Sequence, residues 1–285
     1  MNIQKVIEDL DKLFEEKKIG EVEQYLKEQL CRAKEEGDKG AVLTLLNEQI
    51  GYYRSVSRSE ASLEAFCVAK EWIKDMGLTN TAHEATTLLN GATALRAAGE
   101  LKQAMEEYKR VEVIYDVTLP QGDFRFAGLY NNMSVLYSEL EEYEQVTSVL
   151  LKALEILEGL VEAEIEQAIT YTNLALNYGK LGQREQQKES LTRALTLFEE
   201  YTDNKDGHYA AALSALAGAY YESGEMIEAA KLYQKVCEEI RSYFGENMSY
   251  VVSLENLAVV YRTMGDLDQA EILMNEAEGL RERLQ

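Results

Sequence analysis

Large and small apolar residues recur along this chain in a fixed order. The first pattern is a large apolar residue, a small residue directly after it and a tyrosine four positions after the first, as in Leu257, Ala258 and Tyr261. Residues at i and i+4 lie on one face of an α-helix, so each copy predicts an amphipathic helix. Copies follow one another every 41 or 42 residues and begin at Gln49, Gly91, Met133, Leu174, Leu216 and Leu257.

A second pattern follows each copy of the first. It places a small residue, a large one four positions later and a small or β-branched one after three more, as in Ala229, Tyr233 and Val236. Between the two patterns stands a turn, with glycine at Gly99, Gly182, Gly224 and Gly265. Glycine is favoured just after a helix, where φ is positive. Each unit therefore predicts helix A, a tight turn and helix B, and repetition at this period indicates a solenoid.

These residues resemble the tetratricopeptide repeat. Its usual unit is shorter, and the period of 41 or 42 residues, like the wording of LENLAVVYRTMGDLDQAEILMNEAEGL, is similar to the kinesin-light-chain-like branch. HEAT-like arrays share the period but not the Leu-Ala-x-x-Tyr phrase. The resemblance implies an all-α fold, a right-handed α-α superhelix of helical hairpins in which helix A lines the concave surface and helix B the convex one.

The pattern predicts one continuous solenoid with two parts. Residues 1–39 form a degenerate helix pair at 1–17 and 20–36, and residues 40–285 form six repeats. Helices A and B of the six repeats are expected at 40–56 and 59–76, 80–98 and 101–116, 122–139 and 143–159, 163–180 and 184–201, 207–222 and 226–243, and 248–263 and 267–284.

Composition narrows the class of protein. The formal net charge of −22 disfavours nucleic acid, which requires a basic surface. No apolar run reaches the length of about 18 residues that spans a membrane, and the acidic N-terminal stretch is unlike a signal peptide, so we expect a cytoplasmic protein. Its three cysteines, Cys31, Cys67 and Cys237, are far apart and are expected to be buried, reduced thiols.

No catalytic constellation is present in the sequence. The two histidines, His83 and His208, lack the spacing and the third ligand of a zinc site. Neither a phosphate-binding glycine-rich loop nor a GxSxG elbow occurs. The sequence therefore predicts a protein that is not an enzyme, with no cofactor and no metal.

An asparagine precedes the large apolar residue of helix A in four repeats: Asn90, Asn132, Asn173 and Asn256. Asparagine inside a helix costs about 0.5 kcal/mol relative to alanine, so its repetition suggests a compensating role. The resemblance implies that these amides form a ladder that pairs with the backbone of an extended peptide. The alternative is that they bridge adjacent A helices and bind nothing.

Other polar positions accompany this ladder. Three of its neighbours, Asn131, Thr93 and Thr172, are candidate groove residues, with Thr86 and Ser214 beside them. Cations recur near the ends of the A helices, at Arg54, Arg96, Lys180 and Arg262, where they could bind a ligand's carboxylates or only offset the helix dipole. In matched windows of the last five repeats, helix A holds five acids and four bases, and helix B eighteen and eleven.

The tyrosines divide by register. Those on the two patterns are expected in the core: Tyr53, Tyr108, Tyr137, Tyr178, Tyr220, Tyr233 and Tyr261. The off-register group could stack on a ligand or fill linker contacts: Tyr130, Tyr171, Tyr209, Tyr221 and Tyr250.

We conclude from the sequence that the chain is a scaffold that binds a protein or an extended peptide, with neither nucleic acid nor membrane as partner. Two alternatives stay open. One is a stand-alone sensor of short signalling peptides, as in bacterial proteins with similar repeats. The other is a self-assembling structural protein, with a homodimer through the C-terminal repeat around Ile272 and Leu280.

Overall fold

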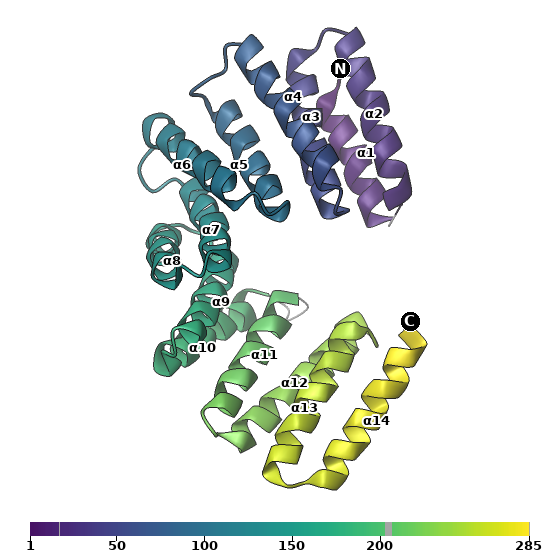
Figure 1. The fold of residues 1–285 in the computed structure, drawn as a ribbon, viewed down its shortest axis with the longest axis vertical. Helices are drawn as coiled ribbons and strands as arrows, with labels where there is room; N and C mark the ends of the chain where they lie inside the picture. Colours follow the sequence, from purple (N-terminus) through teal and green to yellow (C-terminus); the bar gives the residue numbers. More distant parts are fainter. Residues whose placement is uncertain (17, 203–206, 285) are drawn as a thin grey trace. The chain divides into compact units, whose positions relative to one another are not determined.

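A computed structural model describes residues 1–16, 18–202 and 207–284. Within these ranges the chain folds into fourteen α-helices and no strand (Figure 1). They form two compact units, Met1–Leu140 and Glu141–Gln285, here called unit 1 and unit 2. Unit 1 holds α1 (Ile3–Glu15), α2 (Ile19–Glu35), α3 (Lys39–Ser55), α4 (Ser59–Asp75), α5 (Ala82–Ala97), α6 (Leu101–Thr118) and α7 (Phe124–Glu139). Unit 2 holds α8 (Tyr143–Glu158), α9 (Glu164–Lys180), α10 (Arg184–Tyr201), α11 (Gly207–Glu222), α12 (Met226–Phe244), α13 (Met248–Met264) and α14 (Leu267–Leu284).

The helices match the ranges expected from the hydrophobic pattern, with each end displaced by two residues or fewer. The turn between helix A and helix B also has the expected geometry. Gly182 has φ of +71°, and the N–H of Gln183 donates to the carbonyl oxygen of Tyr178 at 2.8 Å. A positive φ costs glycine little because it has no Cβ, so the glycine ends α9 and turns the chain into α10.

Small residues lie where helices cross. Ala175, Ala217 and Ala258, one from each A helix of unit 2, are completely buried. Gly91 takes the place of the large apolar residue in α5, and a Cβ built there would lie 2.1 Å from Cε2 of Phe66 in α4. The Phe66 ring therefore occupies the space that a side chain at position 91 would need, and α5 approaches α4 closely at this point.

In unit 2, each A helix packs against the B helices on both sides of it. α9 contacts α8 and α10, α11 contacts α10 and α12, and α13 contacts α12 and α14. The B helices thus cover one side of every A helix. The opposite side of α9, α11 and α13 forms the surface considered below.

Two groups of tyrosines differ from the expectation. Of the on-register group, Tyr137, Tyr178, Tyr220 and Tyr261 are only half-buried. The off-register group is the more deeply buried one: Tyr130, Tyr171, Tyr209 and Tyr250 lie in the core, and only Tyr221 is half-buried.

The buried off-register tyrosines have a structural role. The hydroxyl of each donates to a carboxylate on a B helix, as Tyr209 does to Glu199 at 2.9 Å and Tyr250 does to Glu276 at 3.1 Å. Burial is the main cause that raises the pKa of both Tyr130 and Tyr250 to about 12. These side chains hold neighbouring helices together and are not ligand platforms.

Two further expectations need correction. Cys237 is buried, and burial raises the pKa of its thiol to about 12, but Cys31 and Cys67 are exposed. At the C-terminal repeat, Ile272 is 59% exposed whereas Leu280 is 2% exposed. Leu280 therefore belongs to the core of unit 2 and cannot contribute to a contact with a second copy.

Candidate functional site

The A helices of unit 2 share a face that the described B helices of this unit do not cover, which we call the A-helix face. It comprises the residues at equivalent positions on the three helices: Ile165, Ile169, Asn173, Leu176 and Lys180 of α9; Gly207, Ala211, Ala215, Gly218 and Glu222 of α11; and Met248, Val252, Asn256, Val259 and Thr263 of α13. Several of its large apolar members are open to solvent: Leu176 is 51% exposed, Val252 47% and Val259 42%, whereas the two isoleucines of α9 are half-buried. Such exposure is unfavourable for a side chain that has no partner.

The middle helix of this face carries small side chains where its neighbours carry large ones. Gly207, Ala211, Ala215 and Gly218 of α11 stand between the aliphatic residues of α9 and α13. At the N-terminal half of α11, between α11 and α13, lies a pocket of about 500 Å³.

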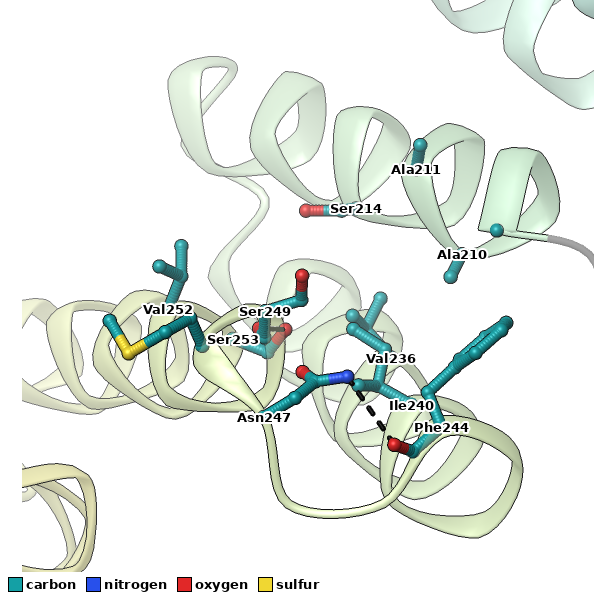
Figure 2. Close-up of a pocket in the computed structure, with 12 residues that line it drawn as sticks. Ala210, Ala211, Ser214, Val236, Ile240, Phe244, Asn247, Ser249, Val252 and Ser253 are labelled. Carbon is teal, nitrogen blue, oxygen red and sulfur yellow. Dashed lines mark hydrogen bonds between the residues drawn. The ribbon is translucent and has the colours of Figure 1, made fainter. Parts of the chain in front are cut away.

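This pocket, here called the α11–α13 pocket, has an apolar floor and polar groups at its sides (Figure 2). The floor comes from the B helix α12, through Val236 and Ile240, both buried. Ala210, Ala211 and Ser214 project from α11 on one side, and Ser249, Val252 and Ser253 from α13 on the other. None of the twelve described residues that line it is charged.

Two of the pocket's serines keep their hydroxyls available. The hydroxyl of the third, Ser253, is engaged within its own helix, because its Oγ donates to the carbonyl oxygen of Ser249 at 2.8 Å. Within the described ranges the Oγ atoms of Ser214 and Ser249 have no hydrogen-bond partner. A hydroxyl both donates and accepts, so each can pair with an N–H or a C=O of a ligand.

Asn247 fixes the rim of the pocket. Its Oδ1 accepts from the N–H of Tyr250 at 3.0 Å and caps the N-terminus of α13. Its Nδ2 donates at 3.5 Å to the carbonyl oxygen of Phe244, the last residue of α12 (Figure 2). The chain from α12 to α13 is thereby tied at both ends, and the α13 wall is held in place.

The sequence-derived candidates of unit 2 lie on or beside the A-helix face. Asn173 and Asn256 are half-buried, and in the part of the chain that the structure describes neither amide has a hydrogen-bond partner. Thr172 donates to the carbonyl oxygen of Ala168 in its own helix at 2.9 Å. Lys180 and Arg262 are exposed and form no ion pair with any described residue.

The candidates of unit 1 are mostly engaged with the protein itself. Asn90 donates from Nδ2 to Oδ1 of Asn47 at 3.0 Å, which links α5 to α3. Asn131 and Asn132 donate to carbonyl oxygens of their own helix, α7, at 3.1 and 2.9 Å. Thr93 lies 3.1 Å from the hydroxyl of Tyr108, a core residue of α6.

The two cations of unit 1 differ from each other. Arg96 donates from Nη1 to Glu139 at 2.5 Å and so connects the C-terminal ends of α5 and α7. Arg54 is half-buried and has no ion-pair partner among the described residues. The asparagines of the expected ladder thus fall into two pairs, one in each unit, and only the pair in unit 2 leaves its amides unpaired.

Sequence reasoning missed most of the α11–α13 pocket. Of the lining residues, the sequence pattern identified only Ser214 as a candidate binding residue. A run of small residues at Gly207, Ala210 and Ala211 could have indicated the pocket, but a sequence does not reveal that these residues face Val252 across a gap.

The described residues contain no group of three or more His, Cys, Asp or Glu that could hold a metal ion. No described helix has the length and apolar character needed to cross a bilayer.

Parts of the chain are similar to a known repeat family. A family model of the tetratricopeptide repeat matches residues 208–283, and a second model of the same repeat matches residues 168–201. These segments include nearly all of the helices from α9 to α14, among them the three A helices that form the A-helix face. No protein with a curated description matches the sequence.

Solved structures of similar fold cover between 71% and 99% of this chain. The apo form of RapI is similar over 99% of this chain and 77% of its own, with a TM-score of 0.77 and 16% identity. The nearly identical TPR-like repeats of a Podosopora anserina protein named for the kinesin light chain cover 71% and 98%, with a TM-score of 0.62 and 19% identity. NprR in complex with its cognate peptide NprX covers 96% and 76%, with a TM-score of 0.59 and 16% identity.

Identities this low show the fold and nothing more specific. The chain is an all-helical protein of stacked, tetratricopeptide-like hairpins, as the hydrophobic pattern predicted.

Proposed function

We propose that this protein is a scaffold that binds an extended segment of another protein or peptide on the A-helix face of unit 2. The observation that supports this most strongly is the character of that face. In a chain of net charge −22, it exposes aliphatic side chains, borders a largely apolar pocket and, among its fifteen residues, has two charged members, Lys180 and Glu222. An exposed apolar surface rimmed by polar residues is typical of an interaction site.

The unpaired amides of Asn173 and Asn256 are the proposed contacts with the ligand's backbone. An extended peptide presents an N–H and a C=O at every residue, and one amide side chain can satisfy both. The pairing is independent of the ligand's side chains, which suits a ladder that repeats along the solenoid. The description of NprR in complex with a cognate peptide is consistent with this use of the fold.

The test requires a peptide, and selection can supply one. Random linear peptides are displayed on phage and selected on the immobilised full chain, and the affinities of the enriched peptides are measured by fluorescence anisotropy. Replacing Asn173 and Asn256 together by alanine should weaken binding by about a hundredfold, because two backbone pairings are lost. Circular dichroism and melting temperature should stay close to those of the unmodified chain.

A matched control separates binding from folding. Asn132→Ala removes an amide that already bonds to its own helix, and it should leave the affinity unchanged. Equal affinity in the Asn173/Asn256 double variant would contradict the proposal. A large fall in melting temperature would instead assign these amides to contacts between repeats.

Two alternatives to a general scaffold remain. A sensor of short signalling peptides would use the A-helix face in the same way but would bind free peptides of defined sequence. The likeness to NprR, which is described in complex with its cognate peptide, supports this alternative. Self-assembly would use α14 instead, through Ile272, and is tested separately below.

A further inference from the structure

We infer that the α11–α13 pocket is the specificity site of this protein, and that it accepts one bulky aliphatic or aromatic side chain from a peptide segment that carries basic residues on either side. The inference rests on the proposed function, since it names the class of peptide that the A-helix face selects. It adds an anchor position, which the asparagine pairing alone does not provide.

The volume and the apolar lining of the pocket determine which kind of side chain it can accept. Its volume of about 500 Å³ lies within the range of about 300–1,000 Å³ typical of ligand sites. Val236 and Ile240 present hydrocarbon at the bottom, and none of the described lining residues is charged, so none of them can pair with a buried charge. A charged or strongly polar side chain would therefore lose its hydration without compensation, whereas an apolar one gains about 25 cal/mol for each Å² removed from water.

The polar groups at the sides place the ligand's backbone. Ser214 on α11 and Ser249 on α13 offer unpaired hydroxyls from the two walls (Figure 2). When a peptide inserts a side chain between the two walls, the backbone N–H and C=O of that residue come close to the walls and lose their contact with water. The hydroxyls can satisfy these groups, so the anchor residue enters without leaving its main chain unpaired.

Charge decides what flanks the anchor. In residues 141–285, Asp and Glu outnumber Lys and Arg by 27 to 12. None of the described residues that line the pocket is charged, and the excess of carboxylates lies mainly on the B helices, so it acts on the ligand outside the pocket rather than on its anchor. An acidic protein favours basic residues beside the anchor and disfavours acidic ones.

The same charge argues against a second copy of this chain as the occupant. Two molecules of net charge −22 repel each other over any shared interface. The pocket also needs a single protruding side chain, not a broad complementary surface. A short extended segment with an apolar anchor and basic neighbours satisfies both the shape and the charge.

The test uses the peptides selected on the full chain. Their enriched sequences should share one Leu, Ile, Met or Phe, with Lys or Arg nearby. Ala211 is exposed at the pocket wall, so Ala211→Trp should fill the pocket without disturbing the core, and Ala211→Leu should fill it partly. Binding should weaken by about a hundredfold for tryptophan and about tenfold for leucine. Thr196→Trp, on the exposed side of α10, is the matched control and should have no effect.

Two results would overturn the inference. One is selected peptides that bind Ala211→Trp as tightly as the unmodified chain. The other is an enriched sequence without an apolar anchor or with acidic flanks. Its failure is distinguishable from failure of the proposed function: peptides that tolerate Ala211→Trp but are lost with the Asn173/Asn256 double variant bind the A-helix face without an anchor in this pocket.

Discussion

The side-chain amide of Asn90 donates a 3.0 Å hydrogen bond to Oδ1 of Asn47 and so connects the A helix α5 to the preceding A helix, α3. Asn47 in turn donates to Oγ1 of Thr87 at 3.1 Å and to the carbonyl oxygen of Leu43 at 3.0 Å. In unit 1 an amide of the expected ladder therefore contributes to contact between repeats. In unit 2 the equivalent amides of Asn173 and Asn256 have no such partner among the described residues.

This difference predicts unequal effects on stability. Asn90→Ala should lower the free energy of unfolding by about 1 kcal/mol, because it breaks a half-buried hydrogen bond between helices. Asn132→Ala removes only a bond to the carbonyl oxygen of Gly128 in its own helix. Since alanine is the better helix former by about 0.5 kcal/mol, this control should be neutral or slightly stabilising. Urea unfolding followed by circular dichroism measures both, and equal losses would contradict the assignment.

The contact between Gly91 and Phe66 makes a second prediction. In Gly91→Ala the new methyl group would overlap the Phe66 ring, and overpacking of this kind costs about 1–3 kcal/mol. Gly128→Ala in α7 meets no atom within 4 Å and should instead stabilise by about 0.5–1 kcal/mol, as expected for a helical glycine.

A double variant identifies the cause of the Gly91→Ala effect. Replacing Phe66 by leucine in that background should restore part of the stability, because the smaller side chain leaves room for the methyl group. If Phe66→Leu and Gly91→Ala destabilise additively, the two positions are not in steric conflict.

Unfolding at high pH should depend on Tyr250. Burial raises the pKa of its phenol from the ordinary value of 10.0 to about 12, so the unfolded chain loses this proton first. The contribution of Tyr250 to stability is fully present below pH 10 and is lost as the pH rises toward 12. The stability difference between the unmodified chain and Tyr250→Phe should therefore shrink or reverse over this interval in urea titrations. A constant difference from pH 8 upward would show that the phenol titrates normally.

Self-association is the alternative that the charge of the chain argues against. Ile272 is the exposed aliphatic residue of α14 singled out for such a contact, and Leu280 is buried. Light scattering at low and physiological salt should give the mass of one chain, and Ile272→Glu should leave that mass unchanged. A defined dimer that Ile272→Glu dissociates would support assembly through the C-terminal repeat.

The helices could be predicted because the period of 41 or 42 residues places every small and large residue in register. Local pattern and glycine turns fix the ends of α9 and α10 without any knowledge of neighbours. The exposure of individual side chains could not be obtained in this way. Tyr178 and Tyr261 stand on the pattern yet are only half-buried, whereas Tyr209 and Tyr250 stand off it and are buried in the core.

For the candidate site, the sequence predicted which side of the A helices carries the polar residues, but not which of their side chains are free to bind. Helical register places Asn173 and Asn256 on the same side of their helices. Whether such an amide is free depends on the next helix: Asn47 lies within reach of Asn90, and no described residue pairs with Asn256. The α11–α13 pocket depends on the distance between two helices far apart in the chain, which Ala211 and Val252 reveal only in three dimensions.

The central claim is that the A-helix face of unit 2 holds the ligand, and photo-crosslinking tests it most directly. A selected peptide carrying a benzophenone at its apolar anchor position is irradiated in complex with the full chain, and the attachment sites are found by mass spectrometry. The account predicts attachment to the walls and floor of the α11–α13 pocket, at Ala211, Val236 or Val252. Attachment to the outer sides of α10, α12 or α14 would contradict it.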